Sequence, residues 1–81
     1  MGTSIHSKEY RDIIHRLIAA RLAAGVTQVQ AGLKLKKPQS YISKIERKER
    51  RIDVVELSQL LKVYKKSLED FFGSKKPTNA G

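Results

Sequence analysis

The chain has 81 residues, enough for one domain with a single modest core, because a domain this short buries only about 60% of the surface that its unfolded form exposes. Its 40% hydrophobic and 31% charged residues are typical of a globular protein and exclude a wholly disordered chain. The absence of Cys excludes disulfides and thiolate zinc sites, and two His cannot build a metal site alone, so we expect no metal and no cofactor.

The sequence carries no signal for a membrane. No apolar stretch approaches the roughly 20 residues that cross a bilayer, and the N-terminus lacks the apolar region of a secretory signal. Met1-Gly2 followed by His6 fails the myristoylation pattern, which requires Ser or Thr at that sixth position. We therefore expect a soluble intracellular protein with no membrane partner.

The net charge of +9 is concentrated in one segment. Residues 34–51 hold eight basic and two acidic residues, a net charge of +6. Such a segment is either a well-solvated surface or a patch that contacts phosphates, and its clustering favours the phosphate contact.

The first predicted element is an amphipathic helix over residues 8–24. Its apolar residues recur at intervals of three and four: Tyr10, Ile13, Ile14, Leu17, Ile18 and Leu22. Ser7 can cap the start of this helix, and Gly25 ends it because Gly most readily takes the left-handed conformation. We expect residues 1–7 to be a flexible N-terminus.

Two short helices follow. Thr27 with Gln30 forms a capping box that opens a helix reaching about Leu35. After the link of Lys36 and Lys37, Pro38 suits the start of a helix over about 38–46. In that helix Tyr41 or Ile42 and Ile45 supply the inward side, whereas four polar residues point outward: Gln39, Ser40, Ser43 and Lys44.

The C-terminal third reads as two more helices. A basic loop over 47–52 leads to the capping box of Asp53 and Glu56, which starts a helix running through Tyr64. Ser67 with Asp70 repeats the cap and box for a short helix ending at Phe72, and residues 73–81 are expected to be a disordered tail. With no strand signal, the prediction is an all-α domain over 8–72.

Two short helices joined by a tight link, the second polar on its outer side, form the arrangement that places a recognition helix in a DNA major groove. The sequence here also resembles a family, the phage-repressor or Cro-like (XRE-type) helix-turn-helix regulators. The resemblance covers about residues 11–72 and lies in Arg21-x-x-x-Gly25-Val26-Thr27-Gln28, in the segment Pro38–Glu46 and in the segment Arg50–Leu57. It implies a compact five-helix bundle of the lambda-repressor type that binds specific double-stranded DNA, in a bacterial or phage-like cytoplasm, nucleoid-associated.

The resemblance also implies roles for single residues. Gln28, at the start of its helix, would grip a phosphate with help from the helix amides at Thr27. The base-reading residues would be Gln39, Ser40, Ser43 and Lys44. The Gln39 amide matches the N6 and N7 edge of adenine, which is worth about 1 to 3 kcal/mol of discrimination. The alternative is that Gln39 is simply a solvated residue at the start of a helix.

Further phosphate contacts are predicted from the basic residues around the link and the loop. They are Lys36, Lys37, Arg47, Lys48, Arg50 and Arg51. Tyr41 could reach a phosphate with its hydroxyl or be purely structural, and the sequence leaves both open. The family pairs an Arg late in its first helix with a Glu ending its third, which implies a structural ion pair between Arg21 and Glu46.

The chain departs from the family at a few positions. Lys36, Lys48 and Lys65 stand where Gly is usual, so the three bends are expected to be reshaped or mildly strained. Ala31-Gly32 stands where Leu-Ala is usual, which removes core volume, and Leu33 either refills that space or is exposed.

The resemblance also implies a homodimer on two half-sites. The candidate contacts are Val63, Leu68, Phe71 and Phe72, unless Leu68 and Phe71 merely close the core. The rival function is a protein-interaction module, such as an antitoxin or a regulator controlled by a toxin or another partner protein. A peripheral membrane role is disfavoured because the apolar stripe of the first helix is needed for the core. No residue arrangement supports catalysis, and His15 beside Asp12 fits a surface contact, so we predict a protein that is not an enzyme.

Overall fold

The computed structural model describes residues 7–73, and every regular element within that range is an α-helix. The helices are α1 (Lys8–Ala23), α2 (Gln28–Leu35), α3 (Gln39–Glu46), α4 (Val54–Val63) and α5 (Leu68–Phe72). The predicted all-α architecture with five helices is therefore confirmed. The predicted flexible start and disordered tail fall largely on residues 1–6 and 74–81, which lie outside the described residues.

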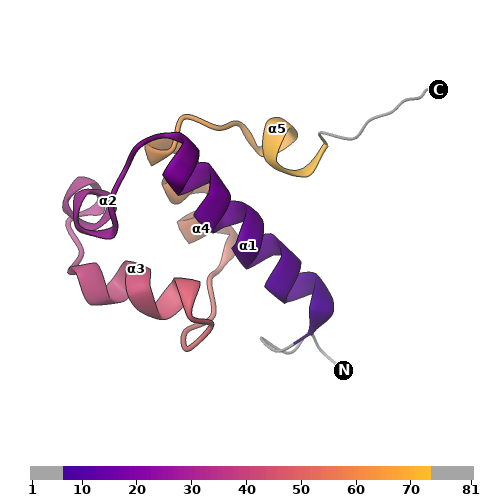
Figure 1. Ribbon diagram of the computed structural model, residues 1–81, viewed down its shortest axis with the longest axis horizontal. Coiled ribbons are helices and arrows are strands. Elements are labelled where there is room, and N and C mark those ends of the chain that lie inside the picture. The colour runs from indigo at the N-terminus through magenta and orange to yellow at the C-terminus, as the bar shows by residue number, and fades with distance from the viewer. Residues whose placement is uncertain (1–6, 74–81) are drawn as a thin grey trace.

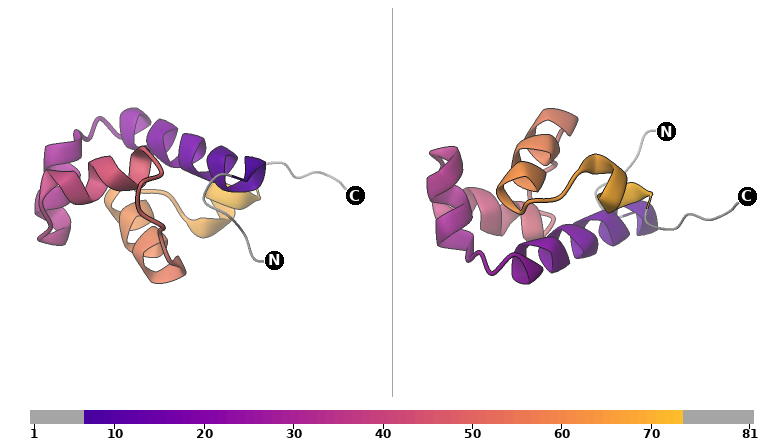
Figure 2. Two further views of the ribbon diagram at one scale, coloured as in Figure 1. Left: turned by 90° about the horizontal axis from the view of Figure 1, so that it is seen from below. Right: turned by 90° about the horizontal axis from the view of Figure 1, so that it is seen from above.

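The helices pack around one core. α1 runs along one side of the molecule, α2 and α3 lie together at one end, and α5 lies beside α1, away from α2 and α3 (Figures 1 and 2). The largest fully buried side chains come from α1, α3 and α4: Ile14, Leu17, Ile42, Ile45, Leu60 and Leu61. The Tyr10 hydroxyl accepts a hydrogen bond from the backbone N–H of Ile52 (3.0 Å), so it ties the α3–α4 loop to α1.

The helix starts agree with the capping signals in the sequence. The Ser7 hydroxyl accepts from the N–H of Tyr10, and the capping boxes at Thr27 and Asp53 are both complete. At α5 the Ser67 hydroxyl accepts from the N–H of Asp70 (2.9 Å), but the reciprocal half of the predicted box is not made. Each cap satisfies a backbone donor that the helix itself leaves unpaired.

The first four helices end in the same Schellman motif, in which a residue in the left-handed conformation lets two amides reach back to the last turn. That residue is Gly25 after α1 but Lys36, Lys48 and Lys65 after α2, α3 and α4, with φ between 59° and 61° at the lysines. The bends therefore keep their usual shape and are strained rather than reshaped. A side chain in this region costs about 1 kcal/mol relative to Gly.

Gly32 is explained by a close approach between α2 and the turn that follows it. The N–H of Lys37 donates to the carbonyl of Gly32 (2.9 Å), and a Cβ at Gly32 would lie 2.7 Å from the carbonyl oxygen of Lys37. The missing side chain lets the backbone turn sharply into α3, so the position that the sequence marks as lost core volume is a packing requirement.

Three side chains lie differently from the amphipathic pattern. α1 ends at Ala23, one residue early, and Leu22 is 62% exposed, because the inward position of this turn belongs to Arg21. Leu33 is 71% exposed, so it does not refill the core space left by Ala31 and Gly32.

Within residues 7–73 no helix is both long and apolar enough to cross a bilayer, and no three potential metal ligands cluster.

Candidate nucleic-acid interface

α3 presents one buried face and one polar face. Tyr41, Ile42, Ile45 and Glu46 are buried against the rest of the domain. On the other side Gln39, Ser40 and Lys44 are exposed and Ser43 is half-buried. α3 lies along the lower edge of the molecule in Figure 1, below α2, so its exposed polar residues are open to a large partner. The predicted outward placement is found at Gln39, Ser40 and Lys44, whereas Ser43 is partly covered.

A hydrogen-bonded chain runs from the core to this face. Glu46 accepts from Arg21 twice, at 2.7 Å from Nε and 3.1 Å from Nη2. The Gln28 amide donates to Glu46 Oε1 (2.9 Å), and the Gln39 amide donates to Gln28 Oε1 (3.0 Å). Gln28 and Gln39 are the first residues of α2 and α3. A buried ion pair therefore orients the side chains at the start of both helices. The predicted contact between Arg21 and Glu46 is present.

The ion pair is almost completely enclosed. The side chains of Arg21 and Glu46 are 11% and 7% exposed, and Arg21 Nη1 also donates to the carbonyl of Val26 (3.0 Å). The hydrogen bonds to Glu46 raise the pKa of Arg21 above its usual value, against the opposing effect of burial. A bidentate guanidinium–carboxylate contact of this kind fixes both orientation and position. It thereby holds α3 against α1 and α2.

Tyr41 anchors two cations on the other flank of α3. Its ring lies 4.8 Å from Arg50 Cζ and 5.2 Å from Lys37 Nζ, and the residue is 8% exposed. Burial raises the pKa of Tyr41, as does the negative charge of Glu56. Cation–π contacts of this sort are worth about 0.5 to 1 kcal/mol at exposed sites. Tyr41 thus links the turn before α3 to the loop after it.

Arg50 is largely occupied by the protein itself. Its guanidinium donates to both carboxylate oxygens of Glu56 (3.0 and 2.8 Å) and to the carbonyl of Arg51 (3.1 Å). These hydrogen bonds lower the pKa of Glu56 to about 2 and raise the pKa of Arg50. Glu56 also accepts from the N–H of Asp53 in the capping box. Arg50 therefore joins the basic loop to the start of α4.

The other predicted phosphate residues surround α3. Lys36 and Lys48 occupy the left-handed positions just before and just after it. Arg47 forms an exposed ion pair with Glu49 (3.1 Å), and Arg51 is exposed. The Thr27 hydroxyl accepts from the N–H of Gln30 as the cap of α2. The basic side chains are thus close to α3 in the chain and lie on solvent-accessible turns.

Comparison with protein-family models identifies the fold and its class. A model described as helix-turn-helix matches residues 17–71, which take in the second half of α1, all of α2, α3 and α4, and α5 up to Phe71. The chain belongs to the helix-turn-helix family. It is a DNA-binding protein of the phage-repressor or Cro type. No curated protein matches the chain.

Sequence reasoning missed three contacts of this helix-turn-helix domain. They are the bond between Gln28 and Gln39, the stacking of two cations on Tyr41, and the clamp between Arg50 and Glu56. The sequence did contain a signal for the contact between Gln28 and Gln39, because both amides stand at the N-terminal ends of consecutive helices joined by a tight turn. The other two contacts depend on the path of the α3–α4 loop, which no short motif encodes.

The residues predicted for a dimer contact divide into two pairs. Phe71 is 4% exposed and Val63 is half-buried against the core, so both close the core. Leu68 and Phe72 are exposed, at 44% and 47%. The Phe72 ring packs edge-on against Phe71 with centroids 4.9 Å apart. Of the four residues, Leu68 and Phe72 are the ones available to a second copy.

Proposed function

We propose that this domain is a transcription regulator that binds specific double-stranded DNA by docking α3 in the major groove. A major groove about 12 Å wide admits one helix, and α3 offers it a polar face of small and amide side chains. The hydrogen-bonded chain from Glu46 through Gln28 to Gln39 supports this proposal best, because it fixes an amide on the open face in one orientation.

Gln39 reads adenine in this proposal. Donation to Gln28 uses one hydrogen of its amide group, which leaves the second hydrogen for adenine N7 and the carbonyl oxygen for the N6 amino group. Gln28 likewise keeps one amide hydrogen after donating to Glu46, and that hydrogen serves a phosphate oxygen. Preorganisation reduces the entropy that the two side chains lose on binding. Ser40, Ser43 and Lys44 complete the base-reading face.

The basic turns position the domain on the backbone. Lys36 and Lys48 flank α3, Lys37 is held by the Tyr41 ring, and Arg47 and Arg51 extend the contact along the loop. Arg50 acts through its clamp on Glu56, which fixes the path of that loop. Phosphate contacts of this type carry affinity without sequence information. Two copies bind adjacent half-sites and meet on DNA through Leu68 and Phe72.

A pair of substitutions tests the assignment of roles. Gln39→Ala should relax base preference at one position and lose about 1 to 3 kcal/mol of discrimination, whereas Arg51→Ala should weaken binding to all sequences alike. The duplex comes from selection in a random DNA pool, and affinity is measured as a function of salt. Arg51→Ala should also reduce the slope of log K against log salt by about 1.

Two outcomes contradict the proposal. A flat salt dependence removes DNA binding through phosphates and leaves the protein-interaction module as the function. Identical behaviour of Gln39→Ala and Arg51→Ala refutes the division between base reading and phosphate contact.

A further inference from the structure

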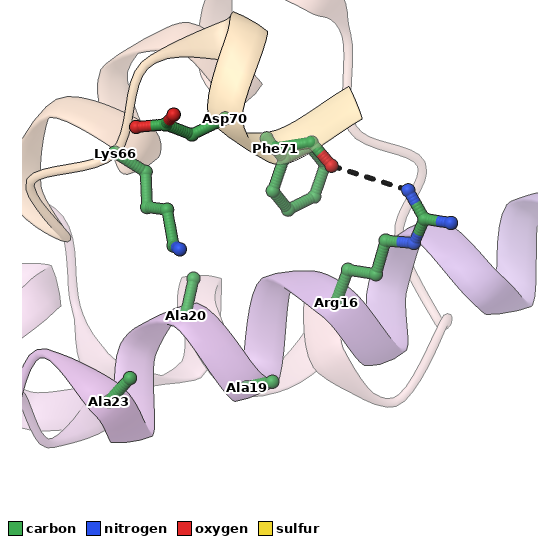
Figure 3. Close-up of a pocket in the computed structure, with 7 residues that line it drawn as sticks. All are labelled: Arg16, Ala19, Ala20, Ala23, Lys66, Asp70 and Phe71. Atoms are coloured by element: carbon green, nitrogen blue, oxygen red, sulfur yellow. Dashed lines mark hydrogen bonds between the residues drawn. The ribbon is translucent and has the colours of Figure 1, made fainter. Parts of the chain in front are cut away.

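A concavity lies between α1 and α5. It has a volume of about 380 Å³, within the range of ligand pockets, and is open to solvent. Its floor is apolar, made by Ala19, Ala20 and Ala23 of α1 and the ring of Phe71 (Figure 3). α5 lies apart from α3 in all three views, so the pocket is separate from the DNA-reading face (Figures 1 and 2).

Two cations border this floor. Arg16 is held at one side by donating from Nη1 to the carbonyl of Phe71 (3.3 Å). Lys66 stands at the other side, where its side chain extends toward Ala20 (Figure 3). The backbone of Lys66 is fixed by the Schellman motif that ends α4, in which its N–H donates to the carbonyl of Leu61 (2.8 Å). The fold therefore holds the backbone of this lysine at the border of the pocket.

The pocket carries an excess of positive charge. Asp70 is the one acid among its lining residues, against Arg16 and Lys66. Within residues 7–73 no carboxylate oxygen lies close enough to Lys66 Nζ for an ion pair. An occupant that brings negative charge to the border and an apolar group to the floor would complement both features.

We propose that this pocket docks an acidic peptide segment of a partner protein, with one large apolar side chain of that segment seated on the alanine and phenyl floor. A DNA backbone has no apolar group to fill such a floor. The net charge of +9 attracts an acidic segment, whose carboxylates then meet Arg16 and Lys66 at the border of the pocket. Since the pocket and α3 lie apart, the partner and DNA bind at the same time.

The test is an NMR titration of the isotope-labelled full chain with a short peptide in which one Phe is flanked by Glu on both sides. The amides of Ala19, Ala23, Lys66 and Phe71 should shift, and those of Gln39 and Ser40 should not. A matched peptide with Gln in place of Glu should bind about tenfold more weakly, because it lacks the charge that Arg16 and Lys66 attract.

Two charge reversals on exposed lysines provide matched variants. Lys66→Glu should weaken peptide binding about fivefold to tenfold, whereas Lys62→Glu should change it by less than about twofold, since Lys62 does not line the pocket. Circular dichroism of both variants confirms that they remain folded. Affinity for duplex DNA, measured in parallel, should be equal for the two variants because they have the same net charge.

Several results would overturn the proposal: no peptide binding, equal effects of the two reversals, or peptide shifts confined to α3. Shifts of the α1–α5 amides that grow with protein concentration in the absence of peptide would assign the pocket to a second copy instead. Because DNA binding is measured separately, loss of the peptide site with DNA binding intact contradicts this inference alone, and the reverse contradicts the proposed function alone.

Discussion

Replacing Glu46 with Met should destabilise this domain more than any substitution on its surface. Arg21 donates two hydrogen bonds to the Glu46 carboxylate, and its side chain is only 11% exposed. Without Glu46 the guanidinium stays enclosed with the carbonyl of Val26 as its remaining acceptor among these contacts. Breaking one partner of a buried pair costs about 3 to 5 kcal/mol. Small domains are stable by only about 5 to 15 kcal/mol in total.

The converse substitution and the double variant complete a thermodynamic cycle. Arg21→Met should also cost about 3 to 5 kcal/mol, because it leaves the Glu46 carboxylate enclosed with Gln28 as its donor. The double variant replaces both charges by apolar side chains of similar length, and it should lie within about 2 kcal/mol of the original protein. The two single effects should therefore be far from additive.

Urea denaturation followed by circular dichroism measures the free energy of unfolding of all four proteins. Single variants that lose less than about 1 kcal/mol would behave like an exposed ion pair and would refute the burial argument. An additive double variant would show that the two side chains act independently. The double variant should also show looser base preference, because Gln28 loses the acceptor that orients it.

Further predictions concern stability. The lowered pKa of Glu56 adds to the free energy of unfolding, in full above the ordinary pKa of 4.5, and this addition is lost as pH falls toward about 2. Urea denaturation should therefore show an acid-labile contribution of about 1 to 3 kcal/mol, which Glu56→Gln abolishes. Lys48→Gly should stabilise the domain by about 1 kcal/mol, and a loss of stability would refute strain at φ 61°. Tyr64→Phe should stabilise the domain by about 1 kcal/mol, measured by thermal unfolding, because among the described residues the buried Tyr64 hydroxyl has no hydrogen-bond partner. A destabilised variant would show that this hydroxyl does have a partner. Gly32→Ala should destabilise the domain by about 1 to 3 kcal/mol, because the new Cβ forces the turn at Lys37 to move. An unchanged melting temperature would contradict the close contact between Gly32 and the Lys37 carbonyl.

Local signals predicted the helices well. The caps at Ser7, Thr27 and Asp53 satisfy backbone donors within three residues, so their geometry is encoded where the helix begins. The apolar stripe of α1 predicted the core positions through Leu17 but placed Leu22 inward. That position depends on Arg21, whose role comes from a partner twenty-five residues away, and hydrophobic periodicity ignores such a partner.

The outer face of α3 was also predictable, because Pro38 sets its start and its period separates Ile42 and Ile45 from the polar residues. The occupation of Arg50 by Glu56 was not. A basic side chain in a loop reads as available to phosphate until the fold shows which carboxylate it meets. The exposure of Leu33 and the left-handed geometry at three lysines likewise required the packed structure.

Selection for stability and selection for DNA binding act in opposite directions on the lysines that follow α2, α3 and α4. Exchange for Gly relaxes the backbone but removes a cation each time. A library of this gene challenged with heat should accumulate glycine at Lys36, Lys48 and Lys65. The same library challenged to hold DNA in high salt should retain lysine at Lys36 and Lys48, the two that border α3.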